Sequence, residues 1–151
     1  MNPSRVEFRA ARASDAERLA ELRVLAMRPS LEAVGRFDPG RARRRFLDGF
    51  VPADTQVLER DGAIVGFVVV RSAPTHLLLD HLYVVPQQQG RGIGAEVLRR
   101  VACTADAARL PLRVGALKGS RANTFYQRQG FTLVEQSDWD NHYVRQPRPA
   151  G

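Results

Sequence analysis

The chain has 151 residues, of which 44% are hydrophobic and 26% are charged, a composition that suits one compact domain and excludes intrinsic disorder. Its net charge of +7 indicates an anionic partner, either a polyphosphate cofactor or nucleic acid. No apolar stretch approaches the roughly 18 residues of a membrane helix, no secretory signal is visible, and the single cysteine, Cys103, excludes an internal disulfide. We therefore expect a cytoplasmic protein that has no membrane partner.

The first elements in chain order are a strand and a helix. Val6–Ala10 is predicted to form the strand, and Ser14 or Asp15 offers the N-cap of the helix. Apolar residues at helical spacing follow the cap. Pro29 is expected to end this helix, because proline lacks the N–H group that continues the hydrogen-bond ladder.

A second helix is predicted from Asp38 or Pro39 to about Phe50. It contains the one dense basic run of the chain, Arg41–Arg45. Phe46 and Phe50 lie at helical spacing, so we interpret the basic run as the solvated face of an amphipathic helix. Nucleic-acid binding is not expected, because base-stacking aromatic residues are not interleaved with the arginines.

Strands and helices then alternate along the rest of the chain. Asp61-Gly62 separates two of the strands and is typical of a tight hairpin turn. The predicted strands are Thr55–Glu59, Ile64–Arg71, His76–Val85, Leu112–Ala116, Thr132–Gln136 and His142–Arg145. The predicted helices are Gly92–Ala108, with Val97, Leu98, Val101 and Ala105 on one face and Cys103 buried, and Arg121–Gln129, which Gly130 ends. The order βααβββαβαββ indicates an α/β sheet covered on both faces.

The most informative segment is a glycine-rich loop between the strand that ends at Pro86 and the helix that follows. Its sequence from Gln89 to Ala95 is QGRGIGA. Glycines let backbone N–H groups face inward, and these groups form an anion site together with the positive end of the next helix. Arg91 adds a positive charge. The loop is therefore predicted to bind phosphate.

Two other phosphate-binding motifs fit this loop poorly. A P-loop requires Gly-Lys followed by Ser or Thr, whereas Gly94 is followed by Ala95 and Glu96. Gly90, Gly92 and Ala95 meet the dinucleotide pattern G-x-G-x-x-A. That motif also requires a first glycine close to the strand and an acidic residue about 20 positions later, and the sequence has neither.

Two blocks of the sequence resemble the GCN5-related N-acetyltransferases, the GNAT family. Gln89, Gly92 and Gly94 match the Q/R-x-x-G-x-G/A pattern of that family's acetyl-CoA loop. About 30 residues later, Phe125-Tyr126 and Gly130-Phe131 resemble its F-Y-x-x-x-G-F block. Both blocks occur in the expected order of elements, so the resemblance covers nearly the whole chain.

The resemblance implies a mixed, mostly antiparallel central sheet with helices on both faces and with splayed fourth and fifth strands, the acyl-CoA N-acyltransferase fold. The implied activity is transfer of the acetyl group of acetyl-CoA to a primary amine by direct attack in a ternary complex. Acetyl-CoA would be the cosubstrate, and no metal is expected because the histidines and the cysteine lack metal-ligand spacing. We expect a single N-acetyltransferase domain over residues 1–146 and a flexible tail over residues 147–151.

The resemblance also assigns the residues that would bind acetyl-CoA. Pantetheine amides would pair with the backbone of Leu82, Tyr83 and Val84, and the N–H group near Leu82 would polarise the thioester carbonyl. Gly119 stands where the family often has an asparagine that contacts the cofactor, and Ser120 or Asn123 is the expected substitute. The residues that would bind the pyrophosphate form one continuous loop: Gln89, Gly90, Arg91, Gly92, Ile93, Gly94 and Ala95.

Two side chains are predicted to be catalytic. Tyr126 would stabilise and protonate the thiolate of CoA as it leaves. Asp80 is expected to act as the general base that accepts a proton from the amine, and His81 is the second candidate. Strand alternation puts Asp80 and His81 on opposite faces of their strand.

The acceptor is predicted to be a small-molecule amine, and the resemblance implies that it binds near Arg28–Phe37 and Gln136–Asn141. Some peptide N-terminal acetyltransferases carry a glutamate base on the fifth strand, and Leu112–Ala116 contains no acid. Two alternatives stay open: a protein or peptide N-acetyltransferase, and a non-catalytic acyl-CoA-binding protein on the same fold. A homodimer is compatible with the sequence.

Overall fold

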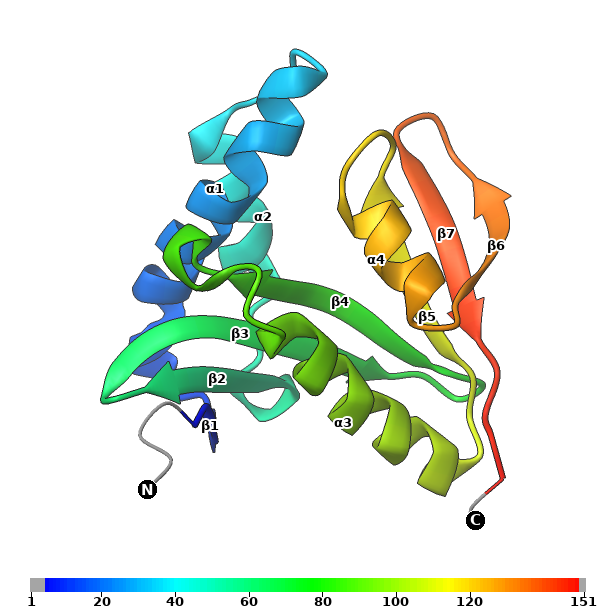
Figure 1. The fold of residues 1–151 in the computed structure, drawn as a ribbon. Helices are drawn as coiled ribbons and strands as arrows, with labels where there is room; N and C mark the ends of the chain where they lie inside the picture. Colours follow the sequence, from blue (N-terminus) through cyan, green and yellow to red (C-terminus); the bar gives the residue numbers. More distant parts are fainter. Residues whose placement is uncertain (1–4, 150–151) are drawn as a thin grey trace. The chain divides into compact units, whose positions relative to one another are not determined.

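The computed structural model describes residues 5–149, and its elements follow the predicted order βααβββαβαββ (Figure 1). The strands are β1 (Glu7–Ala10), β2 (Thr55–Arg60), β3 (Ala63–Ser72), β4 (Leu77–Val84), β5 (Leu112–Leu117), β6 (Thr132–Gln136) and β7 (Asp140–Arg145). The α-helices are α1 (Ala16–Ala33), α2 (Pro39–Asp48), α3 (Ile93–Ala108) and α4 (Ala122–Arg128). Short 3₁₀ helices occupy Ala13–Asp15, Pro52–Asp54 and Pro86–Gln88.

The seven strands form one mixed sheet in the order β1-β2-β3-β4-β5-β7-β6. β4 and β5 pair in parallel, from Leu77 with Leu112 to Leu79 with Val114. The β1–β2, β2–β3, β5–β7 and β6–β7 pairs are antiparallel. This topology confirms the predicted mixed α/β fold. Among the helices of residues 5–149, none is both long and apolar enough to cross a membrane.

The chain divides into two compact units, which are described separately below. The first unit contains the described residues up to Val69 together with His81–Gly94. The second contains Val70–Asp80 and the described residues from Ala95 onward. Residues 147–149 carry no helix or strand, and residues 150–151 of the expected tail lie outside the described part.

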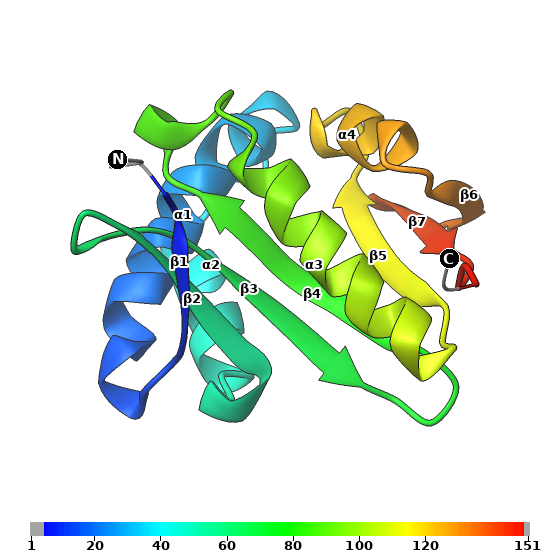
Figure 2. The ribbon, with the colours of Figure 1, turned by 60° about the horizontal axis from the view of Figure 1, so that its bottom comes forward.

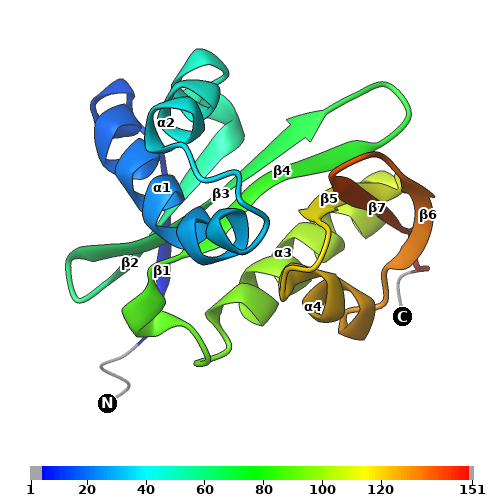
Figure 3. The ribbon, with the colours of Figure 1, turned by 90° about the horizontal axis from the view of Figure 1, so that it is seen from above.

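In the first unit, α1 and α2 lie side by side (Figure 3) and bury a common apolar core with β2 and β3. The largest side chain from α2 in this core is Phe46, whose ring contacts Phe67 of β3 at a centroid distance of 5.1 Å. Leu19 and Leu22 of α1 and Phe46 of α2 thus lie in the core, whereas Leu25, which shares their helical spacing, is 51% exposed. The buried members of the core are Ala11, Leu19, Ala20, Leu22, Phe46, Val57, Phe67 and Val69.

The prediction that Pro29 ends the first helix is wrong, because α1 continues to Ala33. Arg28 and Glu32, one turn apart, form an ion pair of 3.3 Å that spans the proline. The helix ends instead at Gly35, whose φ of +69° is the left-handed conformation of a Schellman cap, and the N–H group of Arg36 donates to Leu31 O.

Asp15 does not cap α1 with its side chain. Its carboxylate accepts hydrogen bonds from the Arg9 guanidinium and from the backbone N–H group of Arg12. A 3₁₀ turn at Ala13–Asp15 therefore precedes the helix. By contrast, Asp38 caps α2 with its side chain, which accepts a hydrogen bond from the N–H group of Arg41 at 3.1 Å.

The predicted turn between β2 and β3 is confirmed. Asp61 has a φ of +53° and Gly62 a φ of +80°, so both central residues of the hairpin are left-handed, as in a type I′ turn. Leu58 pairs with Gly66 and Glu59 pairs with Ile64, so Val65 of β3 is the extra residue at this irregularity of the ladder.

In the second unit, β5 and β7 run side by side (Figure 2) and pair from Leu112 with Arg145 to Leu117 with Asp140. β5 alternates buried and exposed residues, with Leu112, Val114 and Ala116 buried. The predicted apolar face of α3 is confirmed, since Val97, Leu98, Val101 and Ala105 are all buried. Cys103 lies off this face and is exposed, so the expectation of a buried cysteine is wrong.

Candidate active site

The glycine-rich loop of the first unit begins with a 3₁₀ turn over Pro86–Gln88. Gln89 follows this turn, and its side-chain Nε2 donates to Val84 O, the last carbonyl of β4, at 3.0 Å. The backbone N–H group of Val85 donates to Val65 O of β3 at 2.9 Å. These bonds tie both ends of the turn to the sheet of the same unit.

Glycine is required at two positions of this loop. Gly90 has a φ of +79° and Gly92 a φ of +80°, in the left-handed region that other residues occupy at a cost. A Cβ built at either residue would meet no atom within 4 Å, so open space lies over both backbones. Arg91, between them, is exposed.

Helix α3 starts at Ile93, directly after the two glycines, and the buried Ile93 side chain anchors this end of the helix. The first N–H groups of a helix have no partner inside the helix and carry the positive end of the helix dipole. Gln89, Gly90, Arg91 and Gly92, followed by Ile93, Gly94 and Ala95 in the first helical turn, thus form a chain segment suited to an anion.

Sequence analysis did not find Arg60, the last residue of β2. Its Nη1 donates to Oε1 of Gln88 in the 3₁₀ turn at 2.7 Å. The buried Nε atom of Arg60 has no hydrogen-bond partner in the described part of the chain. The contact joins residues 28 positions apart, and no local sequence pattern signals it.

The end of β4 lies beside this loop in the first unit. Leu82, Tyr83 and Val84 are half-buried, and the Tyr83 ring packs 5.5 Å from Phe67, measured between ring centroids. Gly66 of β3 lies so close that a Cβ there would stand 2.4 Å from Tyr83 O. The backbone at the end of β4 is therefore closely packed by β3 on one side.

His81 lies inside an aromatic cluster of the first unit. Its side chain is buried, and its ring centroid is 5.5 Å from that of Phe46, 6.3 Å from that of Phe67 and 5.7 Å from that of Tyr83. His81 and Tyr83 thus share the face of β4 that the alternation pattern predicted.

Asp80, in the second unit, is exposed and forms an ion pair with Arg71. Arg71 Nε donates to Asp80 Oδ2 at 2.8 Å. The carboxylate is therefore held in place by a cation of the same unit.

Asn123 of α4 connects three elements of the second unit. Its Nδ2 donates to Leu117 O of β5 at 2.9 Å and to Ser120 O at 3.0 Å. Its Oδ1 accepts from Asn141 Nδ2 at 2.9 Å and from the Tyr143 hydroxyl at 2.8 Å, both in β7. If the side-chain amide of Asn123 contacted a cofactor, that contact would replace one of these four hydrogen bonds.

Tyr126 is buried in α4 with 6% of its surface exposed. Its ring centroid lies 5.4 Å from Phe125, 5.5 Å from Phe131 and 6.4 Å from Tyr143. The backbone carbonyl of Tyr126 accepts a hydrogen bond from the N–H group of Phe131. This bond closes the end of the helix around Gly130. The tyrosine ring is thus fixed on several sides within its own unit.

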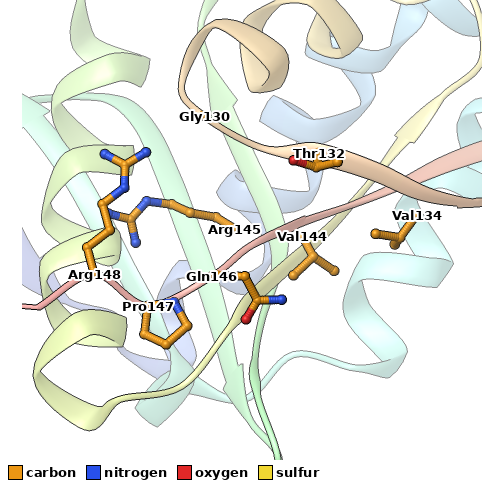
Figure 4. A pocket seen from close by; sticks show the side chains of 8 residues that line it. All are labelled: Gly130, Thr132, Val134, Val144, Arg145, Gln146, Pro147 and Arg148. Carbon is orange, nitrogen blue, oxygen red and sulfur yellow. The ribbon is translucent and has the colours of Figure 1, made fainter.

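The second unit also contains a hollow of about 390 Å³ beside β6 and the end of β7 (Figure 4). Below it, Arg145 forms two hydrogen bonds to Asp106 of α3, at 2.8 and 3.1 Å, and the backbone N–H group of Arg148 donates to the same carboxylate. The Arg145 guanidinium lowers the pKa of Asp106 to about 2. The hollow is lined by Gly130, Thr132, Val134, Val144, Arg145, Gln146, Pro147 and Arg148.

Within residues 5–149, no group of three or more His, Cys, Asp or Glu side chains could hold a metal ion.

Comparison with known proteins gives a family match over the part of the chain that contains the loop. The model of a family described as the acetyltransferase (GNAT) domain matches residues 52–133, which include β2, β3, β4, the glycine loop and α4. No curated protein matched the chain.

Solved structures with the same fold include enzymes of different specificity. PaiA N-acetyltransferase from Thermoplasma acidophilum, solved with coenzyme A, is 15% identical, with a TM-score of 0.75 over 94% of this chain and 99% of its own. Ribosomal-protein-S18-alanine N-acetyltransferase from Escherichia coli is 14% identical, with a TM-score of 0.73 over 97% of both chains. N-acetylglutamate synthase from Neisseria gonorrhoeae is 18% identical, with a TM-score of 0.70 over 96% of this chain and 36% of its own.

Proposed function

The chain belongs to the GNAT acetyltransferase family, and from this premise we propose that it transfers the acetyl group of acetyl-CoA to a primary amine of a small molecule. The observation that carries the proposal is the glycine loop at the end of β4. Gly90 and Gly92 adopt left-handed φ angles with open space over their backbones, directly before the first turn of α3. This arrangement suits the diphosphate of a CoA thioester.

The backbone at the end of β4 would bind the rest of the donor. Leu82, Tyr83 and Val84 would pair with the pantetheine amides, and the N–H group near Leu82 would stabilise negative charge on the thioester oxygen. PaiA N-acetyltransferase was solved in complex with coenzyme A, which supports the binding of a CoA donor by this fold. Asn123 is a weaker candidate for a donor contact, since its amide is already bonded within its unit.

The reaction would be a direct transfer. The neutral amine nitrogen attacks the thioester carbon, the carbon–sulfur bond breaks, the amine loses one proton and the thiolate gains one. Asp80 would accept the amine proton, directly or through water, and Tyr126 would donate to the sulfur. His81 is the alternative base, although its ring is enclosed by Phe46, Phe67 and Tyr83.

The acceptor is proposed to be a small amine that also carries an anionic group. Arg28, in the segment assigned to the acceptor, is exposed, forms an ion pair with Glu32 at 3.3 Å and lies 5.2 Å from the ring of Phe37 as a cation–π pair. Trp139, in the other segment, is 47% exposed. The fold serves a small amino acid in N-acetylglutamate synthase and a protein in ribosomal-protein-S18-alanine N-acetyltransferase, so a peptide acceptor is the second candidate.

A single assay tests the proposal and separates its alternatives. Purified protein would be incubated with acetyl-CoA and a panel of small amines, amino acids and peptides, and release of free thiol would be followed. We expect thiol release that depends on one class of small amine. Release with peptides alone would support the second candidate. Acetyl-CoA binding without thiol release from any acceptor would favour a non-catalytic acyl-CoA-binding protein.

A further inference from the structure

Arg60 is the one cation of β2 that contacts the glycine loop within the first unit. It is the last residue of the strand, half-buried, and it precedes the Asp61-Gly62 turn. Its Nη1 donates to Gln88 Oε1 at 2.7 Å, and Gln88 is the last residue of the 3₁₀ turn that opens the loop. The rigid hairpin thus holds a guanidinium against the start of the loop.

The charge of Arg60 is not compensated inside the described part of the chain. The neighbouring Glu59 is paired with Arg9, at 3.1 Å, and Arg60 forms no ion pair with any described carboxylate. Its Nε atom is buried without a hydrogen-bond partner. Because a half-buried cation with an unpaired Nε atom gains from a nearby anion, this environment suits an arginine that serves a negatively charged ligand.

We propose that Arg60 determines donor specificity: its charge favours thioesters that carry the diphosphate of CoA over thioesters that lack it. This inference rests on the proposed binding of acetyl-CoA at the loop. The hydrogen bond to Gln88 holds the guanidinium at the start of the loop, and the field of the cation would act on an anion bound at the loop. A unit charge acting on a diphosphate several ångströms away, in a partly screened environment, corresponds to an affinity gain of about tenfold.

The experiment compares two donors that differ in the diphosphate. Acetyl-CoA binding would be measured by calorimetry, and binding of S-acetylpantetheine, which keeps the thioester and the pantetheine amides, by NMR titration. Arg60→Gln removes the charge and keeps a side-chain N–H donor for Gln88, whereas Arg60→Lys keeps the charge. Arg41→Gln is the matched control, because it removes an exposed charge from the same unit away from the loop.

We expect Arg60→Gln to raise the Kd of acetyl-CoA about tenfold at low salt, with a smaller effect at high salt. The Kd of S-acetylpantetheine should not change, and Arg60→Lys and Arg41→Gln should bind both donors like the parent. If Arg60→Gln lost affinity equally for both donors, Arg60 would only support the fold. If the Kd of acetyl-CoA were unchanged in Arg60→Gln, the charge of Arg60 would not act on the donor. Either result overturns the inference about Arg60 without refuting the proposed binding of acetyl-CoA by the parent protein. A parent protein that binds no acetyl-CoA would instead refute the proposed function, and this inference with it.

Discussion

Gly66 in β3 lies directly against the backbone carbonyl of Tyr83 in β4. A Cβ at Gly66 would stand 2.4 Å from Tyr83 O and 3.3 Å from Val84 Cα, both of which are backbone atoms that cannot rotate away. The two strands therefore approach this closely only because residue 66 has no side chain. Tyr83 and Val84 belong to the segment proposed to pair with pantetheine, so the glycine also sets the position of a binding surface.

We predict that Gly66→Ala destabilises the protein by about 1–3 kcal/mol, as overpacking does elsewhere, and weakens acetyl-CoA binding. Urea unfolding and calorimetry would measure the two effects. Gly115→Ala in β5 is the control, since a Cβ there would stand at an ordinary 3.5 Å from the His142 ring. Equal stability of the two variants would show that β3 and β4 can separate without cost.

Because Asp15 is paired with Arg9, we predict that the folded state loses stability in acid. Arg9 donates two hydrogen bonds to it, at 2.9 and 3.0 Å, and lowers its pKa to about 2. The pKa of an aspartate in an unfolded chain is about 3.9. The folded state therefore gains stability from this group above about pH 4, and loses it as the pH falls towards 2.

Asp15→Asn should accordingly lower the free energy of unfolding at pH 6, and the difference from the parent should shrink between pH 4 and pH 2. Urea unfolding across this range would measure it. Asp138→Asn, at an exposed position between β6 and β7, should follow the parent at every pH. A difference between parent and Asp15→Asn that stays constant down to pH 2 would contradict the linkage.

The sequence predicted those parts of the fold that depend on local patterns. The apolar spacing of α3, the Asp61-Gly62 turn and the order of strands and helices all follow from periodicity and turn chemistry, which act over a few residues. The end of α1 was mispredicted, because Pro29 removes one hydrogen bond of the ladder without ending the helix, which continues to Ala33 before the cap at Gly35.

For the candidate site, the loop could be predicted because its glycines are consecutive in the chain and their spacing reflects backbone geometry. Arg60 could not be predicted, because it reaches Gln88 only once β2 and the end of β4 belong to the same folded unit. The internal bonding of Asn123 was invisible for the same reason, since its partners in β7 lie 18 and 20 positions away.

We predict that Gly92→Ala weakens acetyl-CoA binding at least tenfold, or about 1.4 kcal/mol. Its φ of +80° disfavours alanine, and a methyl group would occupy the open space where the anion is proposed to lie. Gly35→Ala is the matched control. Gly35 also has a left-handed φ, +69°, and open space around a Cβ, but it lies at the end of α1 and not in the loop. Both variants should lose about 1–2 kcal/mol of stability, and only Gly92→Ala should lose affinity by calorimetry. Parent-like affinity in folded Gly92→Ala would remove the loop from the donor site.

Asp80→Asn tests the proposed base. Because the amine must be neutral to attack, the variant should turn over more slowly at neutral pH and recover at high pH, where more of the amine is already deprotonated. Arg71→Gln is the control for the ion pair, since it removes the partner of Asp80 and keeps the carboxylate. The pH dependence of kcat would be measured for both. Full activity of Asp80→Asn across the pH range would assign the base to another group.

The remaining prediction concerns the hydroxyl of Tyr126. When the tetrahedral intermediate collapses, the sulfur leaves as a thiolate, and a nearby donor stabilises and protonates it. A phenol suits this role, because its ordinary pKa of about 10 keeps the proton on the oxygen at neutral pH. The ring of Tyr126 is held between Phe125, Phe131 and Tyr143, so Tyr126→Phe should keep the packing and remove only the hydroxyl.

Tyr143→Phe is the matched control in the same aromatic cluster. It removes a hydroxyl that donates to Asn123 at 2.8 Å, and it should cost about 1 kcal/mol of stability with kcat near that of the parent. Tyr126→Phe should lower kcat by a factor of about 100 or more, with acetyl-CoA affinity and Tm little changed. Steady-state kinetics would be combined with single-turnover measurements, so that slow product release cannot hide a slower chemical step. If Tyr126→Phe matches the parent in single turnover, the tyrosine only packs, and the thiolate takes its proton from another donor.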